Sequence, residues 1–199
     1  MKRPYTLRRR ADSQAATRQR IIEATVGLHL DVGPAATQIA EVARRAGVQR
    51  ATVYKHFPAE GELFAACSAH WRSLHPMPDT AVWQSIAEPG ARLRKGLADV
   101  YAWYRETRPM TANVLRDAQS LPALAAIIGG GLLKNLDRLA DVLVEPIGAR
   151  GARAERVRIA ARAAIDFGFW QVVEPLGDEA AADLGAGLVE FAATTSRSG

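Results

Sequence analysis

Residues 50–56, RATVYKH, place two cations, two hydroxyl groups and one imidazole within two turns of a predicted helix. Residues four apart lie on the same side of a helix, so Arg50 lies next to Tyr54 and Ala51 lies next to Lys55. Arginine and lysine pair with phosphates and base edges, and hydroxyl groups donate hydrogen bonds to phosphate oxygens. The chemistry that this segment offers is therefore the binding of a polyanion.

The segment before this helix predicts a second, amphipathic helix. Its apolar residues follow the i, i+3, i+4, i+7 spacing of one buried helical face: Ile39, Val42, Ala43 and Ala46. Thr37 offers a side-chain oxygen as an N-cap, and Gly47 can adopt the left-handed conformation that ends a helix. Val48 and Gln49 are left to form the turn between the two helices.

The turn determines which side of the 50–56 helix faces outward. If Gln49 is its N-cap, Val48 and Val53 can form a hydrophobic staple, and Phe57 lies one turn beyond Val53. Two helices joined by so short a turn cross steeply, as in a helix-turn-helix. The cationic face then points outward and fits the major groove of DNA. Spacing alone leaves a second interpretation open, namely a helical hairpin with a polar outer face.

The stretch TQIAEVARRAGVQRATVYKHF resembles the DNA-binding signature of TetR-type bacterial regulators, which runs approximately T-x-x-x-I-A-x-x-A-G-V-S-x-x-T-L-Y-x-H-F. The preceding IIEATVGLHLDVG is similar to the first helix of that family, and the match covers residues 18–64. The resemblance implies a homodimeric repressor with a variable C-terminal ligand-binding domain. It also implies that Arg50 and Ala51 face bases, whereas Thr52, Tyr54, Lys55 and His56 lie at phosphates.

Three positions depart from the family pattern. Gln49 replaces the usual serine cap, and a lost cap costs about 1 kcal/mol, so the third helix should fray but persist. His29 stands where a phenylalanine commonly packs, and we expect a core or boundary histidine there. Glu60 replaces a lysine that often lies near phosphate, so we expect no phosphate contact at that position.

The predicted DNA-binding residues lie in a basic N-terminal arm, in the second helix and at its N-terminal end, and on the third helix. They are Arg8, Arg9, Arg10, Thr37, Gln38, Arg45, Gln49, Arg50, Ala51, Thr52, Tyr54, Lys55 and His56. The arm, residues 1–12, is predicted to be flexible because it is highly charged. It either enters the minor groove or tracks phosphates, or it is a solubilising tail.

The charge distribution agrees with a polyanion partner. Residues 1–57 hold eleven Lys/Arg and four Asp/Glu, a net charge of +7, whereas residues 58–199 have a net charge of −2. The chain is 48% hydrophobic and lacks alternating apolar and polar runs, which predicts an all-α protein. No apolar run is long enough to span a membrane. A single cysteine, Cys67, and the absence of a secretory signal favour a cytoplasmic location.

Residues 61–199 are predicted to form a helical ligand-binding and dimerisation domain after a DNA-binding domain at residues 13–60. We expect a helix over GARLRKGLADVYAWYRETR and a separate short helix that begins at Pro109. Three consecutive glycines, residues 129–131, interrupt the next long helix. Either close packing at a pocket or a local break accounts for them.

Aromatic residues gather in this C-terminal body, and most are expected to form its core. A subset is predicted to line an apolar ligand pocket, where Tyr and Trp supply contact area and a polar group. The candidate ligand-binding residues are Trp83, Tyr101, Trp103, Tyr104, Met110, Phe167 and Trp170. Tyr101, Trp103 and Tyr104 point in different directions from one helix, so at least one should not be simple core.

The last two helices are predicted to form the homodimer interface, as the resemblance implies. Their small residues permit close helix approach: Ala160, Ala164, Ala181, Ala182, Gly185 and Ala186. Packing within one chain is the alternative. A dimer would present two identical DNA readers about 34–36 Å apart, which matches successive major grooves of a palindromic operator.

No residue pattern points to catalysis, a metal or a cofactor. The four histidines are scattered, and His70 and His75 are five apart rather than the four that places two ligands on one helical face. The sequence therefore predicts a transcriptional regulator, namely a repressor released from its operator by a small-molecule effector. The alternatives are a helical interaction or sensing module without DNA binding, and a helical enzyme with an unrecognised site.

Overall fold

The computed structural model describes the backbone of residues 3–194 and the side chains of residues 11–194. Every element in the described range is helical, which confirms the predicted all-α class. The helices form two compact units. Unit 1 comprises the described residues up to His75 together with Pro109–Gly129, and unit 2 comprises Pro76–Arg108 together with the described residues from Gly130.

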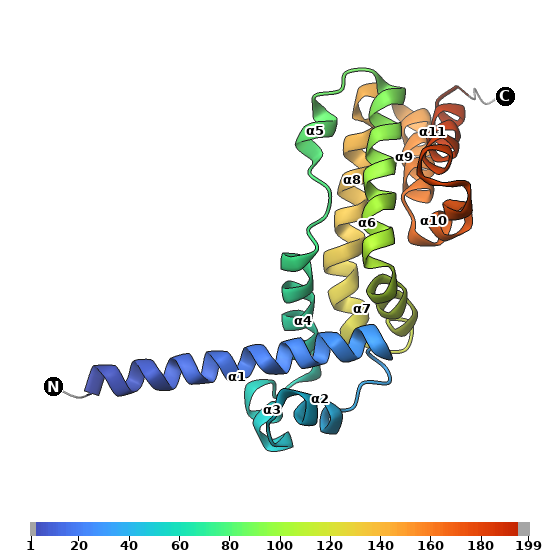
Figure 1. Cartoon of the computed structure of the whole chain (residues 1–199). Helices are drawn as coiled ribbons and strands as arrows, with labels where there is room; N and C mark the ends of the chain where they lie inside the picture. Colours follow the sequence, from blue (N-terminus) through green and yellow to red (C-terminus); the bar gives the residue numbers. More distant parts are fainter. Residues whose placement is uncertain (1–2, 195–199) are drawn as a thin grey trace. The chain divides into compact units, whose positions relative to one another are not determined.

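Unit 1 contains the predicted helix-turn-helix and more of the chain than residues 13–60. Its helices are α1 (Arg3–Asp31), α2 (Ile39–Ala46), α3 (Arg50–His56), α4 (Glu60–Leu74), the end of α6 (Pro89–Asp117) and α7 (Pro122–Ile128). Figure 1 shows α2 and α3 on one side of α1. On its other sides α1 packs against α4, and α4 in turn packs against α7. Unit 1 as defined by contacts therefore includes α4, whereas the predicted domain boundary at residue 60 stays a prediction.

One apolar core joins these helices. It buries residues from α1, α2, α3, α4 and the end of α6, including Ile21, Val26, Val42, Ala46, Val53, Phe57, Leu63 and Met110. Each helix contributes residues that recur every three or four positions, which is the pattern of one buried helical face. In α1, Ile21, Thr25 and Leu28 follow this spacing and are buried, whereas Val32, just after the helix, is exposed.

The first helix differs from the predicted flexible arm. The backbone of residues 3–12 belongs to α1, which runs without a break from Arg3 to Asp31. Arginine is a good helix former, and Pro4 lies in the first turn, where a helix tolerates proline. The high charge of this segment therefore did not predict its backbone conformation, which is helical.

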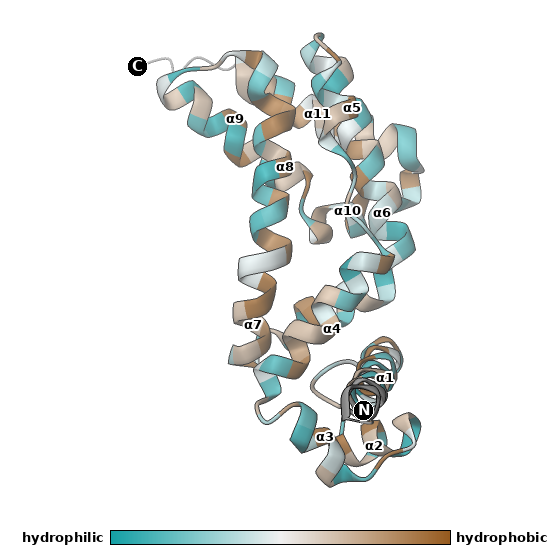
Figure 2. Cartoon of the chain, turned by 90° about the vertical axis from the view of Figure 1, so that its left-hand side faces the viewer, coloured by the Kyte–Doolittle hydropathy of each residue, from teal (hydrophilic) through white to brown (hydrophobic). Residues whose placement is uncertain are grey.

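Unit 2 is built around the first two thirds of α6. The other helices are α5 (Thr80–Gln84), α8 (Lys134–Val144), α9 (Gly151–Ala164), α10 (Phe167–Val173) and α11 (Asp178–Thr194). Short turns join them: η1 (Gly129–Leu133), η2 (Glu145–Ile147) and η3 (Glu174–Leu176). Hydrophilic and hydrophobic residues alternate along the long helices in Figure 2. Among the described residues, no helix is both long and apolar enough to cross a membrane.

The predicted break at Pro109 is wrong, because α6 is continuous from Pro89 to Asp117 with Pro109 inside it. A proline in a helix interior costs about 3 kcal/mol. Buried side chains on both sides of it, Tyr104 and Met110, favour the continuous helix. The glycine run forms the π-helical turn η1 between α7 and α8. A side chain at Gly129 or Gly130 would meet no atom within 4 Å, so a local break explains those two glycines better than close packing.

The small residues of α11 serve packing within the chain. Ala181, Ala182, Gly185 and Ala186 are buried, and α11 packs against α9. A Cβ atom on Gly185 would lie 2.9 Å from the Tyr101 hydroxyl and 3.0 Å from Cδ1 of Leu97. That hydroxyl is held in place, because it donates to the carbonyl oxygen of Ala164 at 2.7 Å. Gly185 is therefore needed for the close approach of α11 to α6.

Gly185→Ala and Gly187→Ala make the same chemical change two residues apart in α11, and each gains about 1 kcal/mol of helix propensity. A Cβ at Gly187 would meet nothing within 4 Å, whereas overpacking at Gly185 costs about 1–3 kcal/mol. Urea unfolding should give Gly185→Ala a free energy of unfolding about 1–3 kcal/mol below that of Gly187→Ala. Equal stabilities of the two variants would contradict this packing.

Candidate nucleic-acid interface

The turn between α2 and α3 depends on the backbone of Gly47. Its φ angle of 65° lies in the left-handed region, as the sequence predicted for a residue that ends a helix. The Val48 amide donates to the carbonyl oxygen of Ala43 at 3.0 Å, and the Gly47 amide donates to that of Arg44 at 3.3 Å. A Cβ at Gly47 would meet no atom within 4 Å, so glycine is favoured here by its backbone conformation alone.

The start of α2 differs from the prediction that Thr37 is its cap. The N-cap is Gln38, whose side chain makes no capping hydrogen bond. The Thr37 hydroxyl instead donates to the carbonyl oxygen of Gly33 at 2.8 Å. Because its hydroxyl bonds to Gly33 and not to the start of α2, Thr37 stabilises the loop between α1 and α2 rather than the first turn of α2.

Two buried residues determine the orientation of α3. Gln49 is the N-cap, as predicted, and its side chain makes no capping hydrogen bond. Val53 is 1% exposed and Phe57 is 4% exposed, and both belong to the core of unit 1. Arg18 of α1 lies over the Phe57 ring, with its guanidinium carbon 4.5 Å from the ring centroid. This cation–π contact fastens the end of α3 to α1.

The opposite side of α3 is open. Arg50, Ala51 and Lys55 are exposed, and Tyr54 is 49% exposed. Thr52 and His56 are half-buried at the two edges of this face. The predicted orientation of α3 is therefore confirmed, whereas contacts between these side chains and DNA stay a prediction.

The remaining predicted DNA contacts are more scattered. Gln38 is exposed at the start of α2. Arg45 is engaged within unit 1, because its guanidinium lies 2.7 Å from Asp31 Oδ2 and 3.2 Å from Glu41 Oε1. Hydrogen bonds to Asp31 and Glu41 raise the pKa of Arg45. The side chains of the predicted arm, Arg8, Arg9 and Arg10, lie outside the described side chains.

A cluster that sequence reasoning missed holds the loop between α1 and α2 against the end of α6. Asn113 Nδ2 donates to the carbonyl oxygens of His29 at 2.8 Å and Leu30 at 3.1 Å. The Ala35 amide donates to Asp117 Oδ2 at 2.9 Å. We call these contacts the α1–α6 clamp. No sequence signal pairs these positions, because they lie 82–84 residues apart in the chain.

Charge stabilises the clamp. Asp117 is 5% exposed, and Arg116 Nε donates to its Oδ1 at 2.7 Å. This hydrogen bond, together with the Ala35 amide, lowers the pKa of the Asp117 carboxyl group. Gly33, with φ at 89°, passes so close to Arg116 and Asp117 that a Cβ would collide with both. The loop before α2 is therefore anchored by an ionised, hydrogen-bonded carboxylate.

His29 is a core residue, as expected at this position, but it is not fully satisfied. Its side chain is 4% exposed, and Nε2 has no hydrogen-bond partner within the described part of the chain. Burial lowers the pKa of His29 to about 4, against a smaller opposing effect of the Asp117 charge. The imidazole is therefore neutral at pH 7.

The predicted ligand-binding residues do not form one group. Trp103, Tyr104, Phe167 and Trp170 form an aromatic cluster in unit 2, with ring centroids 5.1–5.5 Å apart in the contacting pairs. The other three lie elsewhere: Trp83 donates to Asp99 Oδ2 at 2.8 Å, Tyr101 donates to Ala164, and Met110 belongs to the core of unit 1.

The expectation that at least one aromatic of α6 is not simple core stays a prediction, although all three are buried. Tyr101 and Tyr104 are fully buried, and Trp103 is 9% exposed. The Tyr104 hydroxyl donates to the carbonyl oxygen of Ile165 at 2.8 Å, as the Tyr101 hydroxyl does to that of Ala164. Both tyrosine hydroxyls are thus used within the fold, so they are not free polar groups for a ligand.

These features define the class of the protein. A tight left-handed turn, a buried anchor side and an exposed cationic side make α2 and α3 a helix-turn-helix. Among the described residues, no group of three or more His, Cys, Asp or Glu is placed to hold a metal ion. The chain is an all-helical protein with a helix-turn-helix in unit 1.

Comparisons with known proteins agree with this class. Residues 21–67 match the family model of bacterial regulatory proteins of the tetR family. No curated protein matches the chain significantly. The residues that match the model therefore form a DNA-binding domain of the tetR family.

Solved structures extend the likeness to the whole fold. A transcriptional regulator from Rhodococcus sp. RHA1 is 22% identical, with a TM-score of 0.59 over 90% of this chain and 99% of that chain. A TetR transcription regulator from Haloarcula marismortui is 17% identical, with a TM-score of 0.57 over 90% and 97% of the two chains. RolR in complex with resorcinol is 18% identical, with a TM-score of 0.51 over 93% and 97%.

The neutral His29 should make stability depend on pH. Its pKa is about 4 in the folded chain and 6.5 for an ordinary histidine, so between these values the unfolded chain binds a proton that the folded chain does not. The contribution of neutral His29 to the free energy of unfolding is therefore complete above pH 6.5 and is lost as the pH falls to about 4. It amounts to about 3 kcal/mol.

Urea unfolding at pH 7 and pH 4.5 tests this contribution. His29→Phe removes the titrating group. Between pH 7 and pH 4.5 its free energy of unfolding should therefore fall by about 2–3 kcal/mol less than that of the wild type. His70→Phe, a matched change at a half-buried histidine of α4, should behave like the wild type. If the stability of the wild type and of His29→Phe depended equally on pH, His29 would not be the group that makes stability depend on pH.

Proposed function

We propose that this protein is a homodimeric repressor that binds a palindromic operator through α3 and leaves it when a small molecule binds unit 2. The observation that carries the proposal is the outer face of α3, where Arg50, Ala51, Tyr54 and Lys55 are exposed above the buried Val53. The single cysteine, Cys67, is a buried free thiol, which fits action in the reducing cytoplasm.

Each exposed side chain of α3 has a chemical role in this proposal. Arg50 pairs with a guanine edge, and Ala51 is small enough to approach a thymine methyl group. Tyr54 and Lys55, with Thr52 beside them, donate to phosphates and position the helix without reading sequence. The net charge of +7 on residues 1–57 supplies the long-range attraction to DNA.

An apolar stripe on α11 supports dimerisation through the last helices. Leu184, Leu188 and Phe191 follow i, i+4, i+7 spacing and are 46%, 42% and 69% exposed. Ile159, on the neighbouring α9, is 59% exposed. Ala182, Gly185 and Ala186, which pack within the chain, are offset from this stripe around the helix. Burial of such a surface against its copy in a second chain is favourable.

Effector release requires unequal binding to two states of the dimer. An effector in unit 2 would favour the state whose two α3 helices no longer match successive major grooves, with a typical coupling of about 1–3 kcal/mol. The fold that this chain shares with RolR, whose structure is a complex with resorcinol, supports a small-molecule effector.

Selection of bound DNA from a random pool tests the function. The proposal predicts enrichment of a palindrome whose half-sites lie one helical turn, or a multiple of one, apart. Binding should weaken steeply with salt. A helical interaction module without DNA binding would enrich no sequence, and that result would refute the proposal.

Arg50→Ala should relax the preference at one base pair of each half-site. If Arg50 binds a guanine edge with two hydrogen bonds, discrimination at that position should fall by about 1–3 kcal/mol. The measurement is competition binding with operators changed at single positions. An unchanged preference at every position would show that Arg50 only positions the helix.

Tyr54→Phe should weaken DNA binding without changing sequence preference. The substitution keeps the ring and removes the hydroxyl, and a hydrogen bond to a charged phosphate contributes about 1.5–3 kcal/mol. Fluorescence anisotropy should show a similar loss for the best operator and for variants of it. Wild-type affinity in Tyr54→Phe would remove the phosphate contact from the proposal.

Leu188→Glu should convert the dimer into a monomer, because it places a charge in the centre of the apolar stripe. Sedimentation equilibrium measures the change. Val82→Glu makes the same kind of substitution at a 51% exposed apolar residue of α5 and should leave the dimer intact. A dimer that survives Leu188→Glu would place the interface elsewhere.

A further inference from the structure

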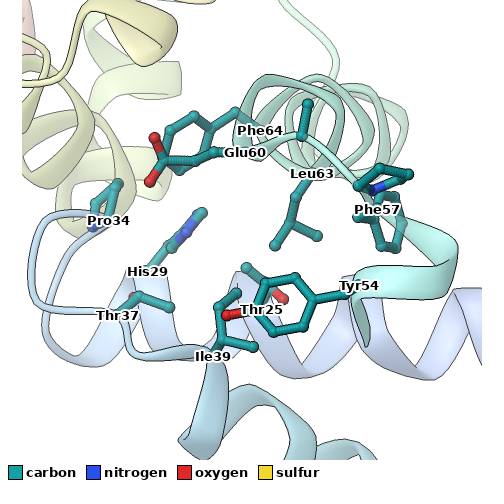
Figure 3. Close-up of a pocket in the computed structure, with 12 residues that line it drawn as sticks. Thr25, His29, Pro34, Thr37, Ile39, Tyr54, Phe57, Glu60, Leu63 and Phe64 are labelled. Atoms are coloured by element: carbon teal, nitrogen blue, oxygen red, sulfur yellow. The ribbon is translucent and has the colours of Figure 1, made fainter. Parts of the chain in front are cut away.

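A cavity of about 120 Å³ lies inside unit 1, beneath the inner side of α3. Its walls come from α1, the loop before α2, the first residue of α2, α3, the segment after α3 and the start of α4 (Figure 3). It lies among the residues of the helix-turn-helix and is therefore distinct from any effector site in unit 2. Phe57, Leu63 and Phe64 give it buried apolar walls.

One polar group of the cavity has no partner. Figure 3 shows the His29 ring projecting from α1 into the hollow, toward Phe64 and Glu60. The side chain is 4% exposed, and its Nε2 makes no hydrogen bond to any described residue. An unpaired polar atom in an apolar surrounding costs about 1–3 kcal/mol, so a molecule that pairs with Nε2 would recover that cost.

The size of the cavity limits its occupant to one small ring. An apolar cavity of about 150 Å³ in another protein holds benzene. The present cavity is slightly smaller, but it opens at a rim formed by the exposed residues Tyr54, Pro58 and Glu60. A ring of six atoms therefore fits with one substituent directed along the cavity.

The lining also determines the charge of the occupant. The Glu60 carboxylate at the rim repels an anion, and the buried apolar walls make the transfer of a cation from water costly. A neutral hydroxyl group both donates and accepts hydrogen bonds, so it can pair with Nε2 in either tautomer of His29. The chemistry therefore favours an uncharged ring that carries a hydroxyl group.

We propose that this cavity is a binding site for a small uncharged ring alcohol of the size of phenol. The hydroxyl group pairs with His29 Nε2, and the ring lies against Leu63 and the Tyr54 ring. Figure 3 shows the Tyr54 ring at the side of the cavity opposite Leu63.

The site is coupled to DNA binding through Tyr54, and this consequence rests on the proposed function. The Tyr54 side chain forms a wall of the cavity, and it is also the predicted phosphate donor. A ligand that holds this ring changes the position of its hydroxyl group. Because coupling between two sites is reciprocal, DNA must change the affinity for the ligand by the same factor.

Titration of the full-length protein with phenol, followed by NMR of the backbone amides and the histidine rings, tests the site directly. Saturable shifts should concentrate at residues that line the cavity, His29 and Tyr54 among them. Phenol should bind at least fivefold more tightly than benzene. Shifts confined to unit 2, or equal affinity for benzene and phenol, would overturn the proposal.

Three variants localise the binding. His29→Phe keeps an aromatic ring without the nitrogen and should reduce the preference for phenol over benzene to less than twofold. His29→Gln places an amide near the position of Nε2 and should retain part of that preference. His70→Phe should bind phenol like the wild type. Unchanged preference in His29→Phe, with native-like spectra, would exclude His29 as the partner.

Operator titration with and without saturating phenol tests the coupling. The affinity of the wild type for its selected operator should change at least threefold, and that of His29→Phe should change less than twofold. An unchanged wild-type affinity would overturn the coupling to DNA. Absence of any operator binding would instead count against the proposed function, because the phenol titration uses no DNA.

Discussion

The burial of Val53 and Phe57 under α3 is the constraint on which the rest of unit 1 depends. A helix of seven residues has little stability of its own, so packing must hold it in place. Two anchors one turn apart leave only one side of α3 for solvent, and the cations and hydroxyl groups lie on that side. Gly47 makes this possible, because its left-handed backbone turns the chain from α2 into α3 within two residues.

The same unit is held together by the α1–α6 clamp. Asn113 binds the last carbonyl groups of α1, and Asp117 binds the loop that leads to α2. The position of the helix-turn-helix within unit 1 therefore depends on the C-terminal end of α6. His29 lies between the clamp and the cavity beneath α3, since its carbonyl oxygen accepts from Asn113 and its ring lines the cavity.

Local signals predicted the helix-turn-helix well, whereas contacts between distant segments escaped prediction. Gly47, Gln49 and the inward pair Val53 and Phe57 follow from turn chemistry and spacing within a few residues. Asp117 gave no such signal, because its partner Ala35 lies 82 positions away. The break expected at Pro109 did not occur, because buried residues on both sides of it, Tyr104 and Met110, favour one continuous helix. Tertiary packing overrode local preference there.

The most direct test of this account is the operator affinity of two Gly47 variants. Both add a side chain where there is free space, so only the backbone conformation distinguishes them. Asparagine tolerates a positive φ angle, whereas a β-branched valine is strained there. The account predicts that Gly47→Asn keeps near-normal affinity and that Gly47→Val loses at least tenfold under conditions where circular dichroism shows both folded. Equal affinities would show that the turn at Gly47 does not control the presentation of α3.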